Sequence, residues 1–480
     1  MKGTGDSAKI RVVFNGSSRT NSGTSLNNWL RAGPNLLPAL SDVLTRWRHH
    51  RFVLATDIEK MYRQISVHPE DRDLQRILWG MEEITEHQLN TVTYGLACAP
   101  FLAIRVLHQL ADDEGDRFPL GAEAVRCDTY VDDILSDAPT LAGAQRLREQ
   151  LTWLCTAGGF PLRKWSANHD QILQGVPREH CSQGATDTIL PSAAQSILGL
   201  RWDHEIDCFA PTVRTMPPGQ ETKRSLLSGT ARLFDPLGWL APVTVRAKLL
   251  IQATWLQQLD WDAPLAEEES TAWARMKDEL PLLEGIRVPR WMQSDQPGAS
   301  VEVHGFSDAS ERAYAAVVHL RTTCAESERT SLVLAKTRVA PLRRVSLPRL
   351  KLCAAALLAK LVAHTRATLT LTRAPTFMWT DSTVVLGWIR GPPRQVDNLR
   401  RQQGRRGASP GDGCPVAARA RTRQSGGLCI QGVSPRELLS HPLWWQGPGF
   451  LRQESSSWGA GGCGDRGPPG ATDDPAHRRD

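Results

Sequence analysis

Two acidic segments, each next to a run of apolar residues, constrain the fold of this chain more than any other feature. Residues 51–58 contain a short apolar run of the kind that forms a buried strand, and Asp57 lies near its end. Residues 127–136 form two short β-prone arms that flank Asp132 and Asp133. This pattern predicts a hairpin with both acids at its tip. The sequence therefore predicts a folded domain that presents carboxylates on rigid strand ends.

Carboxylates in this arrangement are suited to phosphoryl-transfer chemistry. Two Mg²⁺ ions held about 4 Å apart need acidic ligands on rigid elements, and three acids can supply them. One ion would activate a 3′-hydroxyl, and both would stabilise the in-line transition state. A lone Asp-Asp pair is more often a solvated turn, so the residues around it must decide between the two interpretations.

The rest of the chain alternates between helical and strand patterns up to about residue 390. Apolar spacing predicts helices around residues 101–110, 141–154, 223–283 (with a break at 235–238) and 349–369. The glycine pair at 158–159 is expected to end the second of these helices. Strands are expected at residues 300–320, near 332 and at 377–380.

Composition excludes several classes of protein. The 480 residues carry 57 basic and 51 acidic side chains, a net charge of +6, and 41% are hydrophobic, as in a globular protein of several domains. This mild positive charge permits a polyanionic partner without proving one. No apolar run is long enough to span a bilayer, and no secretory signal is visible at the start. The ten cysteines form no C-x-x-C pair, which favours free thiols in a reducing compartment.

The segments around the acids occur in an order that resembles the reverse transcriptase of BEL/Pao-type LTR retrotransposons. Eight ordered blocks carry the resemblance, where a Tyr-x-Asp-Asp tetrad alone would be a moderate signal. The blocks cover residues 9–14, 25–27, 55–64, 67–69, 89–104, 130–133, 159–165 and 198–202.

The resemblance implies an α+β fold of the right-hand polymerase type, with fingers, an antiparallel palm sheet and a thumb. Asp57, Asp132 and Asp133 would be the catalytic acids, and Mg²⁺ would be held by Asp57, Asp132 and the backbone carbonyl of Ile58. The resemblance also implies roles for residues that contact the nucleotide or the primer. These are Lys9 and Arg11 as triphosphate-binding cations, Tyr62 as the steric gate against ribonucleotides, Tyr94 and Gly95 beside the nascent base pair, and Leu198 and Gly199 as the primer grip.

Each of these residues has a simpler alternative. Lys9 and Arg11 are equally compatible with solvated charges on a strand, Tyr62 with a core aromatic, and Gly95 with an ordinary turn glycine. Two departures from the family bear on nucleotide binding. Asn15 replaces the usual aspartate, and Met1 falls within the fingers, so the first strands of that subdomain are expected to be absent.

The resemblance predicts four parts along the chain. Residues 1–205 would be the fingers and palm, 206–295 the thumb and connection, 296–395 a mixed α/β ribonuclease H-like domain, and 396–480 a disordered or frameshifted tail. In this family the second part also carries the name of a Pao retrotransposon peptidase. A retroviral-type aspartic protease needs Asp-Thr-Gly or Asp-Ser-Gly, and neither tripeptide occurs.

The ribonuclease H-like part resembles a two-metal nuclease whose acid set is incomplete. Asp308 and Asp381 match two of the four acids expected in such a site. Lys351 stands where the family has glutamate, and an ammonium group there repels the cation and removes an oxygen ligand. We therefore expect a degenerate ribonuclease H site.

The fourth acid is missing from a tail of unusual composition. Residues 391–480 hold 16 of the 38 glycines, 10 of the 31 prolines and 13 arginines without a lysine, and only residues 438–445 keep an apolar pattern. With suitable codons, residues 423–431 read one base later give Asp-Asn-Pro-Ala-Asp-Phe-Ala-Ser-Arg, which resembles the family, and residues 396–404 behave in the same way. A pair of compensating frameshifts is one hypothesis, and an arginine-rich nucleic-acid-binding arm is the other.

The sequence therefore predicts an RNA-directed DNA polymerase that uses two Mg²⁺ ions, a primed RNA or DNA template and deoxynucleoside triphosphates. The alternatives are a catalytically inactive transposon remnant that retains at most nucleic-acid binding, and a Pao-type peptidase. No membrane association is expected, and the family suggests a cytoplasmic, virus-like-particle location. The sequence leaves the oligomeric state and the template preference open.

Overall fold

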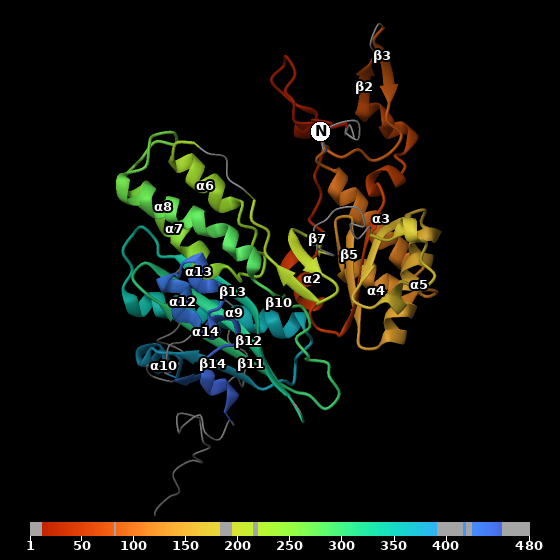
Figure 1. Cartoon of the computed structure of the whole chain (residues 1–480). Helices are drawn as coiled ribbons and strands as arrows, with labels where there is room; N and C mark the ends of the chain where they lie inside the picture. The colour runs from red at the N-terminus through yellow and green to blue at the C-terminus, as the bar shows by residue number, and fades with distance from the viewer. Residues whose placement is uncertain are drawn as a thin grey trace, which may run out of the picture. The chain divides into compact units, whose positions relative to one another are not determined.

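The structure is a computed structural model, and it falls into two compact units (Figure 1). It describes residues 12–80, 83–182, 194–214, 219–325, 327–390, 416–418 and 425–453. The first unit comprises residues 1–213 and 283–299, and the second comprises residues 214–282 and 300–480. The division into four parts expected from the sequence stays a prediction.

A four-stranded antiparallel sheet with the order β4-β5-β1-β6 forms the centre of the first unit. Its strands are β1 (Phe52–Ile58), β4 (Thr129–Tyr130), β5 (Asp133–Ala138) and β6 (Leu162–Ala167). β1 is buried over most of its length because it lies between two strands and packs against α5. The helices of this unit are α1 (Leu26–Trp29), α2 (Leu40–Arg46), α3 (Ala99–Asp113), α4 (Pro119–Cys127) and α5 (Leu141–Ala157).

Helices α3, α4 and α5 carry the apolar residues of the main core of this unit. As expected from the glycine pair, α5 ends at Ala157 with Gly158 as its C-cap, and Gly159 follows with φ of +73°, a conformation that favours glycine at a helix end. Short 3₁₀ turns and a two-stranded hairpin complete this part: η1 (Met61–Gln64), η2 (Pro69–Gln75), β2 (Arg76–Trp79), β3 (Thr85–Gln88), η3 (Asp170–Leu173) and η4 (Arg178–His180). The β2–β3 hairpin extends away from the rest of its unit (Figure 1).

A second antiparallel sheet of the first unit joins residues that are far apart in the sequence. Its order is β10-β9-β8-β7, from the strands β7 (Ala194–Ile197), β8 (Leu200–Asp203), β9 (Cys208–Ala210) and β10 (Val288–Pro289). Next to β10, the fully buried guanidinium of Arg290 makes two 2.7 Å bonds to the carboxylate of Asp207. It also donates to the backbone carbonyls of Trp47, His50 and Arg51. Arg290 therefore joins this sheet to the segment between α2 and β1.

The second unit combines a helical segment with a five-stranded mixed sheet of order β13-β12-β11-β14-β15. β14 runs parallel to both β11 and β15, whereas β11, β12 and β13 are antiparallel. The strands are β11 (Ser300–Ala309), β12 (Ala313–Cys324), β13 (Ser327–Val339), β14 (Thr376–Thr380) and β15 (Val416–Ala418). The helices are α6 (Lys223–Ala231), α7 (Ala241–Leu256), α8 (Glu267–Glu279), followed by η5 (Leu280–Gly285), then α9 (Leu347–Thr368) and α10 (Thr383–Arg390).

The expected break in the helical segment is a loop that attaches α7 to β13. Asp235 accepts a 2.9 Å hydrogen bond from the backbone N–H of Leu240 at the start of α7. The N–H of Ala335 on β13 donates to the carbonyl of Leu237 at 2.9 Å. Gly238 has φ of +75°, and a Cβ there would lie 1.8 Å from the carbonyl oxygen of Ala335. Only glycine allows the loop to lie this close to the strand.

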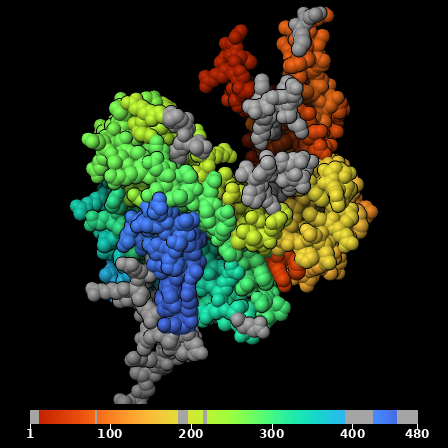
Figure 2. All heavy atoms as spheres, in the orientation of Figure 1, coloured from red at the N-terminus to blue at the C-terminus, as the bar shows by residue number. Residues whose placement is uncertain are grey.

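The expectation of a disordered tail is wrong for residues 425–453. They form α12 (Ser425–Gln431), α13 (Pro435–Leu439), α14 (Pro442–Trp445) and η6 (Gly449–Arg452). Cys429, Leu438, Trp444 and Leu451 are fully buried. Figure 2 shows this segment, in blue, lying against the green and teal residues of the same unit. A few large apolar side chains thus provide enough burial to fold a segment whose overall composition is typical of disorder.

The other expected elements are present at or within a few residues of their predicted bounds, except that residues 257–266 form a second break in the helical segment expected at 223–283. The eight cysteines in the described ranges are free, as expected. No helix in the described part of the chain is long and apolar enough to cross a membrane.

Candidate active site

The pairing of β1 with β5 brings the first set of acids together. In the antiparallel register Asp57 is opposite Asp133, and the N–H of Ile58 donates a 2.8 Å hydrogen bond to the carbonyl of Asp132. Asp132 itself lies in the turn between β4 and β5. Residues separated by 75 positions in the sequence are therefore neighbours at one end of a buried sheet.

The turn that carries Asp132 is strained. Val131, the residue before it, has φ of +61°, in the left-handed region that β-branched residues rarely adopt. Such a conformation costs on the order of 1–3 kcal/mol and persists only where the surrounding structure imposes it. Strain of this kind is concentrated at active sites and ligand-binding turns, which supports a functional role for this turn.

Lys164 on β6 is a member of this site that sequence reasoning did not assign to it. Its Nζ lies 2.7 Å from Oδ2 of Asp57. Partial burial acts to lower the pKa of Lys164, but the hydrogen bond to Asp57 and the charges of Asp133 and Asp132 raise it above the usual value. The available signal was a lysine inside an otherwise buried strand, in a block already matched to the polymerase family.

Negative charges are clustered around the carboxyl group of Asp133. Burial, together with the charges of Asp132 and Asp57, raises the pKa of Asp133 to about 6, although Lys164 acts in the opposite direction. Like charges this close favour a bound cation, because each carboxylate is more stable when a positive charge is near.

The oxygen ligands available here suit Mg²⁺. Among the described residues, no three histidine, cysteine or acidic side chains are grouped closely enough to form a metal cage. Mg²⁺, however, usually binds through one or two carboxylates and completes its shell with water and substrate phosphates. The expectation that Asp57, Asp132 and the backbone carbonyl of Ile58 form a set of that kind stays a prediction. The side chain of Ile58 is fully buried in the core, so only its backbone is available.

Tyr62 lies in η1, and its ring is partly buried against the main core. Burial raises the pKa of its hydroxyl, and the charge of Asp132 raises it further, so the phenol faces the negative end of the site. The ring therefore packs against the core on one side, and the role of Tyr62 as a steric gate stays a prediction.

Tyr94 and Gly95 form a turn that packs closely against the N-terminal segment. The hydroxyl of Tyr94 donates to the carbonyl of Val12 at 2.6 Å. Gly95 has φ of +92°, and a Cβ there would lie 2.2 Å from the carbonyl oxygen of Phe14. The side chain of Asn27 donates to the carbonyl of Gly95 at 3.0 Å. Glycine at position 95 is therefore required by the backbone and by the close contact.

The remaining predicted residues of the polymerase site are on a separate turn or outside the described structure. Leu198 and Gly199 form the two-residue turn of the β7–β8 hairpin, with φ of +46° and +85°. Two positive φ values in a row are typical of the tight turns that match strand twist. Lys9 and Arg11 lie outside the described residues.

In the second unit, Asp308, Lys351 and Asp381 form a separate cluster. The parallel register of β11 and β14 pairs Ser307 with Thr380, so Asp308 and Asp381 follow paired residues. Nζ of Lys351, on α9, lies 2.6 Å from Oδ2 of Asp381 and 3.7 Å from Oδ1 of Asp308. Burial and the charge of Asp381 raise the pKa of Asp308 to about 6, although Lys351 lowers it. The three residues singled out from the sequence are thus brought together, with an ammonium group between the two acids.

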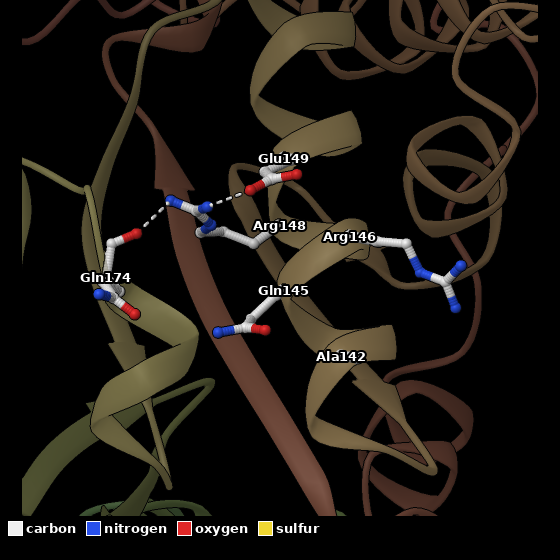
Figure 3. A pocket seen from close by; sticks show the side chains of 6 residues that line it. All are labelled: Ala142, Gln145, Arg146, Arg148, Glu149 and Gln174. Atoms are coloured by element: carbon white, nitrogen blue, oxygen red, sulfur yellow. Dashed lines mark hydrogen bonds and ion pairs between the residues drawn. The ribbon is translucent and has the colours of Figure 1, made fainter.

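A surface hollow beside α5 is unrelated to either cluster of acids. It is lined by residues of α5 and by Gln174 (Figure 3). Arg148 in this hollow donates to Glu149 and to the backbone carbonyl of Gln174, which attaches α5 to the segment after η3. The guanidinium of Arg148 therefore has a structural role in this hollow.

Comparison with protein families matches part of the chain. Residues 222–382 match the family model described as Pao retrotransposon-like RNaseH-like domain. The matched segment begins just before α6, spans the second unit through β14 and includes Asp308, Lys351 and Asp381. No curated protein matches the chain by sequence.

The fold of most of the chain is similar to that of a solved structure. The foamy viral protease–reverse transcriptase dRH in complex with double-stranded DNA aligns with a TM-score of 0.51 and 10% identity, over 82% of this chain and 60% of its own. The foamy viral protease–reverse transcriptase in complex with an RNA/DNA hybrid aligns with a TM-score of 0.48 and 10% identity, over 81% of this chain and 46% of its own.

At such low identity the first match shows the fold alone, and the chain spans 60% of the length of that structure. The mixed α+β architecture is thus similar to that of a retroviral reverse transcriptase. Residues 222–382 are thus similar to the Pao retrotransposon-like RNaseH-like domain, and the fold of most of the chain is similar to that of a foamy viral protease–reverse transcriptase.

Proposed function

We propose that this chain is an RNA-directed DNA polymerase that adds deoxynucleotides to the 3′-hydroxyl of a primer. The observation that carries the proposal is the β1–β5 pairing, which places Asp57 opposite Asp133 and hydrogen-bonds Ile58 to Asp132. A buried sheet that ends in three carboxylates, beside a strained turn, is the arrangement that phosphoryl transfer with Mg²⁺ requires. The partner would be a primed RNA or DNA template.

In this proposal Asp57, Asp132 and the carbonyl of Ile58 hold Mg²⁺, and Asp133 adds negative charge beside them. When bound, Mg²⁺ would favour ionisation of the primer 3′-hydroxyl and neutralise charge on the transferred phosphate. Lys164 balances the charge of Asp57 when no cation is bound, and must move from Oδ2 when one binds. Tyr62 would contact the sugar of the incoming nucleotide.

Primer extension by the full chain tests the proposal. Purified protein is supplied with poly(rA)/oligo(dT), Mg²⁺ and deoxythymidine triphosphate, and incorporation is compared with that of Asp132→Asn. We expect the variant to lose more than about 100-fold of the rate, as is typical when an electrostatic contact to the transition state is removed. Asp170→Asn, an exposed acid of the same unit, is the matched control and should retain full activity.

A catalytically inactive remnant that still binds nucleic acid is the second candidate. The observation in its favour is the ammonium of Lys351 between Asp308 and Asp381 in the second unit. Incorporation no greater than that of Asp132→Asn, together with retained binding of an RNA/DNA hybrid by fluorescence anisotropy, would establish the remnant and refute the polymerase.

A Pao-type peptidase is not favoured by any contact in the described residues. An aspartic peptidase needs two acids that share a proton, and here the two acids of the second unit share an ammonium group instead. Self-cleavage of the chain that is lost in Asp308→Asn would be the result that reinstates this alternative.

A further inference from the structure

We propose that Lys351 closes the Asp308–Asp381 pair to divalent cations, and that position 427 is the place from which a further carboxylate is missing. Two substitutions, Lys351→Glu and Gly427→Asp, would then convert a closed ion pair into a site for Mg²⁺ or Mn²⁺. This inference concerns the second unit only and is independent of polymerase activity in the first.

The contacts of Lys351 explain why the present site excludes a cation. Lys351 lies near the start of α9, which packs against β11 and β12. Its side chain and that of Asp308 are 17% and 18% exposed, so both charges are largely removed from water. The ammonium group contacts one carboxylate oxygen of Asp381 and lies near one carboxylate oxygen of Asp308. A divalent cation would need these same oxygens and would be repelled by the lysine.

The missing carboxylate is indicated by the position of α12. This helix packs against β11 and β12, and its glycines lie beside Asp308. A Cβ built on Gly427 would lie 3.5 Å from Oδ2 of Asp308, which is ordinary van der Waals contact. A side chain at this position can therefore start without a clash and extend along the carboxylate of Asp308.

The reading of residues 423–431 one base later agrees with this geometry at three positions. The fifth residue of that reading, aspartate, falls at position 427. The third, proline, falls at Ser425, the first residue of α12, where proline is favoured because its missing N–H has no helical partner. The fourth, alanine, falls at Gly426, where a Cβ would lie 3.2 Å from the backbone nitrogen of Asp308 and only a small side chain fits.

Pro-Ala-Asp, from the reading one base later, would therefore favour the start of α12 more than Ser-Gly-Gly at residues 425–427, because glycine is a poor helix former. The geometry leaves room for a carboxylate at position 427, and the frameshift hypothesis, which assumes suitable codons, gives an aspartate at the same position. With Lys351→Glu the site would have four acids at the ends of β11 and β14, on α9 and on α12. Carboxylate oxygens alone favour hard cations such as Mg²⁺ and Mn²⁺.

Mn²⁺ binding by the full chain tests this inference without any activity assay. All variants carry Asp57→Asn and Asp132→Asn, so that acids of the first unit do not contribute. We expect the Lys351→Glu/Gly427→Asp chain to bind Mn²⁺ in electron paramagnetic resonance titrations with a dissociation constant below about 1 mM. Addition of Asp308→Asn should abolish that binding. Lys360→Glu/Gly427→Asp, with the same charge change at an exposed position of α9, should bind none.

Two results would overturn the inference. One is Mn²⁺ binding by the chain with Lys351 and Gly427 intact that disappears with Asp308→Asn. The other is absence of binding in the repaired chain while its circular dichroism matches that of the parent. Should the repaired chain fail to fold, Lys351→Gln decides the matter. This variant leaves the two acids without a counterion, so 5 mM Mn²⁺, on the order of a weak site's dissociation constant, should raise its melting temperature. An equal effect of Mn²⁺ on the parent and the variant would refute the proposal.

Discussion

His319 should make the second unit sensitive to mild acid. It lies on β12 with its side chain fully buried, and its Nε2 is 3.0 Å from the carbonyl oxygen of Trp444 in the C-terminal segment. Burial, together with the charge of His304 on the paired strand, lowers the pKa of His319 to about 4, although the bond to Trp444 acts in the opposite direction. In the unfolded chain the imidazole has its ordinary pKa of about 6.5.

The direction of the effect follows from these two pKa values. Below pH 6.5 the imidazole of His319 binds a proton in the unfolded chain, whereas in the folded chain it stays neutral until the pH nears 4. The contribution of His319 to the stability of the folded unit is therefore fully present above pH 6.5 and is lost as the pH falls. Between pH 7.5 and pH 5 the loss amounts to about 2 kcal/mol for this single group. His319→Gln should remove that loss, because glutamine can donate to Trp444 and carries no titratable group.

Hydrogen exchange measured by mass spectrometry on peptides of β12 is the appropriate assay, since a chain with two compact units has no single free energy of unfolding. After correction for intrinsic exchange rates, protection between pH 7.5 and pH 5 should fall further in the parent than in His319→Gln. His364→Gln on the exposed face of α9 is the matched control and should behave as the parent. The reasoning is refuted if parent and His319→Gln lose protection equally.

Two further predictions concern the first unit. Arg290→Ala should destabilise this unit by about 3–5 kcal/mol, because it leaves Asp207 and three backbone carbonyls without their buried partner. Urea unfolding of the unit measures this loss of stability. A change under about 0.5 kcal/mol, which is typical of a surface site, would contradict the prediction. Tyr62→Ala should raise ribonucleotide incorporation relative to deoxynucleotide incorporation at least about tenfold, because it removes the ring that faces the site. The ratio of kcat/KM values measures this effect, and an unchanged ratio would assign Tyr62 to the core alone.

Much of the local structure could be predicted from the sequence because it depends on short-range patterns. The apolar spacing of α5 and the glycine pair after it specify a helix and its end, and the two arms around Asp132 specify a hairpin. The tail shows the limit of such patterns. Its glycines and arginines dominate the composition, while the burial of Trp444 against the carbonyl of Trp239, 205 residues away, leaves no local signal.

The site residues divide in the same way. Asp57, Asp132 and Asp133 were identified from their own segments and from a resemblance, and the structure makes them neighbours. Lys164 escaped assignment because its contact with Asp57 depends on the pairing of β6 with β1, across 107 positions. The lysine at position 351 was enough to predict a degenerate metal site from the sequence. Its ion pair with Asp308 and Asp381 depends on the fold.

The sequence by itself determined several helices and strands before residue 390, which acids are present and which expected acid is replaced by lysine, because these properties are local or are residue identities. Only the tertiary structure decided what each of these side chains meets. It brought Lys164 to Asp57, closed Asp308 and Asp381 around Lys351, and placed Gly427 beside Asp308. The physical reason is that strand register and helix packing set distances between residues far apart in the chain, and the energy of a charge depends on those distances.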